Sequence, residues 1–154
     1  MSSAALPFEV ELHGAQDTEA LGARLAPLLA PGDVILLEGP LGAGKTTLVR
    51  GLVAALGGDA TEVCSPTFVL LESYAVEAWP ILRVHHADLY RLRGRPAAPL
   101  DEVGLGDCLE DPAAITAIEW PESWPWLPSL GVRALGVRLE FAPNGRCAAV
   151  AARR

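Results

Sequence analysis

Hydrophobic and polar positions change their period along the chain, which predicts both strands and helices. Apolar residues alternate with acidic ones over residues 8–12, as in a strand with one exposed face. The next segment carries leucines at helical spacing, at Leu21, Leu25, Leu28 and Leu29. Asp17 or Thr18 can cap this helix, and Pro27 should kink it or end it early.

A buried strand, a glycine-rich loop and a second helix are predicted between residues 33 and 58. Residues 33–38 read DVILLE, the short apolar run of a buried strand. Leucines then recur at helical spacing, at Leu48, Leu52 and Leu56, and the Gly-Gly pair that follows them supplies a stop. Between the two elements the chain reads GPLGAGKT.

The rest of the chain predicts mostly strands, at residues 68–74, 81–86, 115–118, 137–141 and 147–150. A Pro-Asn-Gly turn at residues 143–145 joins the last two strands into an antiparallel hairpin. Helices alternate with strands only in the first half. The pattern therefore predicts an α/β fold with a mixed, mostly parallel sheet flanked by helices, in one domain over residues 1–154.

Composition narrows the class of protein. Hydrophobic residues make up 51% and charged residues 20%, which is ordinary for a globular protein. A net charge of −7 repels nucleic acid, so the chain is not expected to bind tRNA or DNA by itself. Three widely spaced cysteines argue against a disulfide framework and a zinc site. With no signal-like or membrane-length apolar run, we expect a soluble, cytoplasmic protein.

The segment GPLGAGKT, residues 39–46, is a complete phosphate-binding loop of the form G-x-x-x-x-G-K-[ST]. Its Lys45 is the only lysine among twelve basic residues, at a point where a compact ammonium reaches phosphate oxygens better than a guanidinium does. The order strand, loop, helix points backbone N–H groups at an anion. Lys45 is expected to bridge the β- and γ-phosphates, and Thr46 to hold Mg²⁺.

Hydrolysis also needs an acid near Mg²⁺ and a group that orients water. Glu119 closes an apolar strand and is expected to reach the metal beside Thr46, because ligands gather at the carboxyl ends of strands. Asp88 also ends a strand, where it is expected to hold a metal-bound or attacking water. Thr67 follows a proline in the region where NTPase switches sense a γ-phosphate, although a plain turn fits it equally well.

Other polar residues favour ordinary roles. His85 and His86 are neighbours on a strand and so face opposite ways, which predicts one buried and one surface histidine and no two-histidine metal site. Arg91, Arg93 and Arg95 form a basic patch, either solvated or in contact with a partner or tRNA.

Together, five segments resemble the TsaE family, small bacterial P-loop ATPases of the tRNA threonylcarbamoyladenosine pathway. They are GPLGAGKTT, SPTF (65–68), HADLYRL (86–92), EVGLGD (102–107) and IEWPE (118–122), and the resemblance spans roughly residues 15–150. Two positions depart from the family pattern. Pro40 replaces an acidic residue in the loop and removes one backbone N–H, and Ala87 replaces an aromatic residue before Asp88.

The resemblance implies that ATP, with Mg²⁺, binds to the loop residues Gly39, Pro40, Leu41, Gly42, Ala43, Gly44, Lys45, Thr46 and Thr47. It also implies nucleotide contacts from Thr18 and Arg146 and metal ligation by Thr46 and Glu119. Asp88 matches the catalytic aspartate of the histidine motif, and Trp120 matches the tryptophan of the E-W-P motif, with a switch or partner role. Family members act with the TsaB and TsaD proteins in repeated transfer of threonylcarbamoyl to adenosine 37 of tRNAs that read codons beginning with A. Contact with tRNA is then indirect, through the complex.

Two other readings of the phosphate-binding loop stay open. One is a small-molecule P-loop kinase, which needs an arginine-bearing lid that only residues 91–95 could supply. The other is a binding subunit whose nucleotide state sets assembly, without significant hydrolysis. A GTPase is disfavoured, because a sole lysine in the loop leaves no N-K-x-D base-reading motif.

Replacing Lys45 or Thr46 with alanine should abolish the function that depends on Mg-nucleotide, because each change removes a phosphate or metal contact. ATP hydrolysis by the Lys45→Ala and Thr46→Ala proteins measures this. Hydrolysis at the normal rate in either variant would contradict the roles given to these residues.

Overall fold

A computed structural model describes residues 5–65, 70–94, 103–123 and 131–153. Within these residues seven strands form one sheet: β1 (Phe8–Leu12), β2 (Val34–Glu38), β3 (Leu71–Ala78), β4 (Ile81–Asp88), β5 (Ala114–Glu119), β6 (Ala134–Ala142) and β7 (Gly145–Arg153). The helices are α1 (Ala15–Leu25), α2 (Lys45–Ala55) and α3 (Leu105–Glu110). Short 3-10 turns are η1 (Ala26–Leu28), η2 (Ala60–Glu62), η3 (Tyr90–Leu92) and η5 (Pro121–Ser123). No helix in the described ranges is long and apolar enough to cross a membrane.

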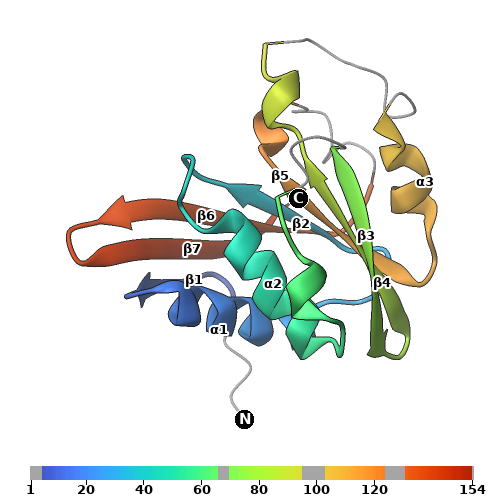
Figure 1. Cartoon of the computed structure of the whole chain (residues 1–154), viewed down its shortest axis with the longest axis horizontal. Helices are drawn as coiled ribbons and strands as arrows, with labels where there is room; N and C mark the ends of the chain where they lie inside the picture. Colours follow the sequence, from blue (N-terminus) through green and yellow to red (C-terminus); the bar gives the residue numbers. More distant parts are fainter. Residues whose placement is uncertain (1–4, 66–69, 95–102, 124–130, 154) are drawn as a thin grey trace.

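The strand order is β1-β7-β6-β2-β5-β4-β3 (Figure 1). The four central strands, β6, β2, β5 and β4, run parallel, and antiparallel pairs close both edges of the sheet. The predicted mixed α/β fold and its C-terminal hairpin, β6–β7, are confirmed. In this register Glu119 lies beside both Leu37 and Asp88. The carboxyl ends of β2, β5 and β4 therefore lie side by side at the same end of the sheet. The phosphate-binding loop follows directly from β2 at this end.

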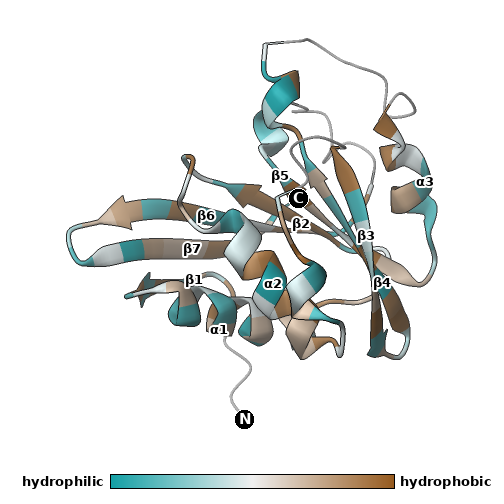
Figure 2. Cartoon of the chain, viewed as in Figure 1, coloured by the Kyte–Doolittle hydropathy of each residue, from teal (hydrophilic) through white to brown (hydrophobic). Residues whose placement is uncertain are grey.

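Both faces of the central strands are covered. Ile35 and Leu37 of β2 lie in a core with α1 and α2, whereas Val34 and Leu36 lie in a second core with α3. Burial on both faces explains why β2 reads as a continuous apolar run. Figure 2 shows hydrophobic and hydrophilic colours mixed along α1 and α2, as expected for helices that bury one face.

The first helix differs from its prediction at one end. It begins at Ala15, with Gly14 as its cap, so neither Asp17 nor Thr18 occupies the cap position. The Asp17 carboxylate instead accepts a hydrogen bond from the His13 backbone N–H at 2.8 Å, from inside the first turn. The other end agrees with the prediction, since the helix stops at Leu25 and Pro27 lies in the 3-10 turn that follows.

The prediction that one of the two adjacent histidines lies at the surface is wrong. His85 is 8% exposed and His86 is 0% exposed. Strand β4 lies between β3 and β5, and its residues from Val84 to Asp88 are all buried, so both histidines lie in the covered part of the strand. His85 contacts the Ser73 hydroxyl at 2.6 Å and the Asp111 carboxylate at 2.9 Å.

Helices α1 and α2 approach closely through glycines. A Cβ atom on Gly22 would overlap the backbone oxygen of Leu48, and one on Gly51 would overlap the backbone oxygen of Glu19. This contact fixes α2, and with it the phosphate-binding loop, against the N-terminal part of the fold.

Gly51→Ala should lower the free energy of unfolding by about 1–3 kcal/mol, because the overlap forces the helices apart. A Gly→Ala change inside a helix ordinarily raises the free energy of unfolding by up to about 1 kcal/mol. The sign of the measured change therefore shows whether the two helices pack this closely. Denaturant unfolding measures the difference. A stabilised Gly51→Ala protein would contradict the packing.

Asp111 should make stability depend on pH. Two hydrogen bonds from Arg83, at 2.7 and 2.8 Å, hold the pKa of this carboxyl well below its usual range, with further support from Ala113 and His85. A depressed pKa stabilises the fold above the unfolded-state value of about 3.9, and this contribution is lost as the pH falls through the folded-state value. Asp111→Asn should lower the melting temperature by roughly 2–6 °C at neutral pH.

Thermal unfolding of both proteins across pH tests this. The gap between wild type and Asp111→Asn should shrink as the pH falls below about 4, where the unfolded carboxyl becomes protonated. A gap that stays constant from neutral to acid pH would show that the ion pair contributes nothing.

Candidate functional site

Two glycines shape the phosphate-binding loop, at positions where any side chain would be strained. A Cβ atom on Gly39 would lie 2.5 Å from the Leu139 backbone oxygen. Gly44 has a φ of +108° and would place a Cβ atom 3.2 Å from the Thr18 side chain. Helix α2 begins directly after it, at Lys45, so the free N–H groups of its first turn face the loop.

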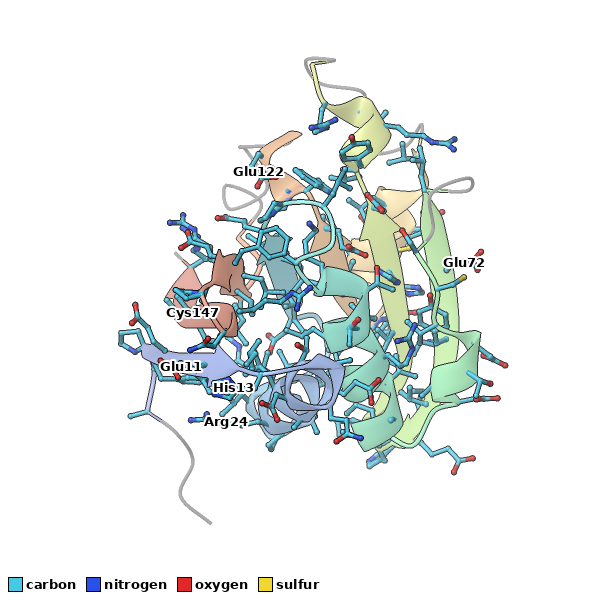
Figure 3. The ribbon with its side chains drawn as sticks, turned by 60° about the vertical axis from the view of Figure 1, so that its left-hand side comes forward. Glu11, His13, Arg24, Glu72, Glu122 and Cys147 are labelled. Carbon is cyan, nitrogen blue, oxygen red and sulfur yellow. The ribbon has the colours of Figure 1, made fainter. Side chains whose placement is uncertain are left out.

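Lys45 is buried at the base of the loop, with 5% of its surface exposed. Its Nζ atom donates to the backbone oxygens of Gly39, at 2.5 Å, and Pro40, at 3.0 Å. Burial lowers the pKa of the ammonium, and the charges of Glu119, Asp88 and Glu122 partly offset this. Figure 3 shows Glu122 toward the top of the view, well away from Glu11, His13 and Arg24.

Thr46 and Glu119 are in direct contact. The Thr46 hydroxyl donates to Glu119 Oε2 at 3.0 Å, and Glu119 is 3% exposed. In the part of the chain that the structure describes, no cluster of three His, Cys, Asp or Glu residues could hold a metal alone. Mg²⁺ does not need one, because it binds through one or two protein oxygens and completes its shell with phosphates and water. This all-oxygen pair therefore fits Mg²⁺.

Asp88 lies next to Glu119 and is firmly oriented. Its Oδ2 atom accepts from the Ser65 hydroxyl at 3.1 Å, and its Oδ1 atom accepts from the Tyr90 backbone N–H at 2.9 Å. Sequence reasoning gave Ser65 no role of its own, although it opens the quoted segment SPTF. Thr67, in the same segment, lies outside the described residues.

His86 is the second residue that sequence reasoning missed. Its Nε2 atom lies 2.6 Å from Glu119 Oε2, and its Nδ1 atom lies 3.1 Å from the Tyr74 hydroxyl. The sequence feature that could have indicated a role for His86 in the site is its position in the segment HADLYRL, two residues before Asp88.

Two cations lie close to the Trp120 ring. The Lys45 Nζ atom lies 4.1 Å from its ring centroid, the Arg93 guanidinium lies 5.1 Å away, and Tyr90 packs edge-on at 5.0 Å. Its φ of +61° is strained for a bulky residue, a geometry that collects at functional sites. Of the predicted basic patch, Arg91, Arg93 and Arg95, Arg93 therefore lies beside the site. Arg95 lies outside the described residues.

The two outlying nucleotide contacts implied by the family lie against the loop. The Arg146 Nη2 atom, on β7, donates to the Gly42 backbone oxygen at 2.8 Å. Thr18 of α1 is buried beside Gly44, where a Cβ atom added to the glycine would lie 3.2 Å from the Thr18 side chain. Neither residue lines the cavity in front of the loop.

A cavity of about 330 Å³ opens in front of the loop, within the range of small-ligand pockets. Its lining consists of Leu41, Gly42, Ala43, Gly44, Lys45, Thr46, Thr47, Ser65, Asp88, Tyr90, Glu119 and Trp120. A larger hollow, about 630 Å³, lies over β1, β7 and β6. Its two arginines, Arg138 and Arg153, are already paired with Glu38 at 3.2 and 3.1 Å, so the smaller cavity has the better groups for phosphate.

Comparison with known proteins decides the family. The family model described as "Threonylcarbamoyl adenosine biosynthesis protein TsaE" matches residues 12–145. The chain belongs to the TsaE family.

TsaE relatives from several bacteria share much of the sequence. The Synechocystis protein is 43% identical over 112 residues, which cover 73% of this chain and 69% of the relative. The Nostoc protein is 41% identical over 128 residues, with coverage of 82% and 76%. The Mycobacterium tuberculosis protein is 40% identical over 129 residues, with coverage of 81% and 74%. Each is described as a tRNA threonylcarbamoyladenosine biosynthesis protein TsaE.

A solved structure shares the fold. The crystal structure of YdiB from Bacillus subtilis superposes with a TM-score of 0.61 and 25% identity, covering 96% of this chain and 84% of that one.

The structure accommodates both residues that depart from the TsaE sequence pattern, Pro40 and Ala87. Pro40 is exposed and still offers its carbonyl oxygen to Lys45 and to the Ala43 N–H. Ala87 is buried in the second core, beneath α3.

Proposed function

We propose that this chain is an Mg²⁺-dependent ATPase needed to form threonylcarbamoyladenosine at position 37 of tRNAs that read codons beginning with A, working in the cytoplasm with TsaB and TsaD. Membership of the TsaE family supports the pathway. The contact between Thr46 and Glu119, at 3.0 Å, carries the proposal of hydrolysis, because it joins a phosphate-binding loop to an acid at a strand end.

The residues divide the work between binding and positioning. Lys45 and the first N–H groups of α2 would hold the phosphates. Thr46 and Glu119 would hold Mg²⁺, which when bound neutralises charge on the phosphate oxygens. Asp88, which is held by Ser65 and by the Tyr90 N–H, would accept a hydrogen bond from a water molecule and so orient it.

The charge of the chain supports an indirect role with tRNA. At −7 the chain repels a polyanion, and Arg93, which lies 5.1 Å from the Trp120 ring, is stacked on Tyr90 at 3.7 Å. Partner proteins would therefore bring the tRNA, while this chain supplies the nucleotide-driven step.

The two alternatives predict different products. A small-molecule kinase would transfer phosphate rapidly to a metabolite, and a binding subunit would show negligible turnover under all conditions. The family and the stacking of Arg93 both favour the ATPase over the kinase.

Phosphate release from ATP, measured for the chain alone, with TsaB and TsaD, and with Mg²⁺ or EDTA, tests the proposal. We expect weak turnover alone and substantial, Mg²⁺-dependent turnover in the mixture. Rapid phosphate transfer to a metabolite would overturn it, and no turnover in the complete mixture would favour the binding subunit.

Glu119→Ala should spare the fold but reduce hydrolysis in the same mixture by on the order of 100-fold or more, because it removes the acid beside Thr46. Glu140→Ala is the matched control, since Glu140 is an exposed acid on another strand, β6, and its loss should leave nearly full activity. Circular dichroism and thermal unfolding check that both variants fold. Normal hydrolysis by the Glu119→Ala protein would refute its role at the metal.

A further inference from the structure

A buried hydrogen-bonded pair, Tyr74 and His86, stands directly behind Glu119. His86 is 0% exposed and Tyr74 is 3% exposed. The imidazole lies between the Tyr74 hydroxyl, 3.1 Å from Nδ1, and Glu119 Oε2, 2.6 Å from Nε2. The mechanism above uses neither residue, yet buried polar groups of this kind need a partner for each donor and acceptor.

The contacts determine where the protons lie. Glu119 Oε2 already accepts from Thr46, so as a carboxylate it must also accept from His86, which places a hydrogen on Nε2. In the neutral ring Nδ1 is then an acceptor. The Tyr74 hydroxyl lies 3.5 Å from the Cys64 carbonyl oxygen and 3.1 Å from Nδ1, and it donates to the nearer Nδ1. Burial is the main reason that the pKa of Tyr74 rises to about 12, so the phenol keeps this proton at neutral pH.

We propose that His86, held in this tautomer by Tyr74, is a positioning residue that fixes the Glu119 carboxylate for Mg²⁺. Both bonds to the carboxylate, from Thr46 and from His86, end on Oε2, and neither uses Oε1. They hold Oε2 beside the loop. A metal ligand oriented by a second layer of hydrogen bonds binds more tightly than a free one. The inference rests on the proposed Mg-nucleotide site.

His85 provides an internal control. It precedes His86 on the same strand, is also buried, and is also bonded to a hydroxyl and a carboxylate, those of Ser73 and Asp111. Those partners are not part of the nucleotide site. Loss of His85 should therefore disturb the packing of β4 as much as loss of His86, without touching Glu119.

The test measures binding of a fluorescent ADP, methylanthraniloyl-ADP, with Mg²⁺ and with EDTA. In His86→Leu the gain in affinity that Mg²⁺ provides should fall about 10- to 100-fold, while affinity in EDTA stays unchanged. His86→Gln should recover part of the gain, because its amide N–H can replace the donor to Glu119. Tyr74→Phe should lose less than His86→Leu, and His85→Leu should match the wild type.

Several results would overturn the inference. An unaltered Mg²⁺ gain in both His86→Leu and Tyr74→Phe would show that the pair does not act on the metal. Equal losses with Mg²⁺ and with EDTA, or an equal loss in His85→Leu, would show a purely structural role. If His86→Leu does not fold, Tyr74→Phe, which removes only a hydroxyl, decides. A wild type with no Mg²⁺ gain at all would instead refute the metal site, and the inference with it.

Discussion

The hydrogen bond between Thr46 and Glu119 is the contact on which the site depends. It joins the first turn of α2 to the end of β5, two elements that are far apart in the sequence. The parallel register of β2, β5 and β4 brings these ends together, and the close packing of α1 on α2 keeps the helix in place. Without that register, the loop could bind phosphate but would have no acid beside its threonine.

Local patterns were sufficient to predict much of this fold. The segment from the buried strand to the second helix could be predicted because its strand, glycines and leucine stripe are contiguous. The same is true of Glu119 and Asp88, which end apolar runs, although their roles stay predictions. The structure adds that these two acids are neighbours across paired strands.

What the sequence did not reveal depends on contacts between distant segments. The partnership of His86 with Glu119 needs the pairing of β4 with β5, and the burial of His85 needs the cover of that strand by the rest of the fold. The role of Ser65 becomes visible only in the fold, where its hydroxyl donates to the Asp88 carboxylate. Helix α3 has six residues, too few for a clear helical period, so nothing in the pattern predicted it.

The central claim is that nucleotide bound at Lys45 drives a step of tRNA modification. Its most direct test is the threonylcarbamoyladenosine content of tRNA in a bacterial strain depleted of its own TsaE protein and supplied with this chain. We expect the wild type to restore the modified nucleoside and the Lys45→Ala protein, expressed at the same level, to leave it depleted. Equal restoration by the two proteins, or none by the wild type, would contradict the account.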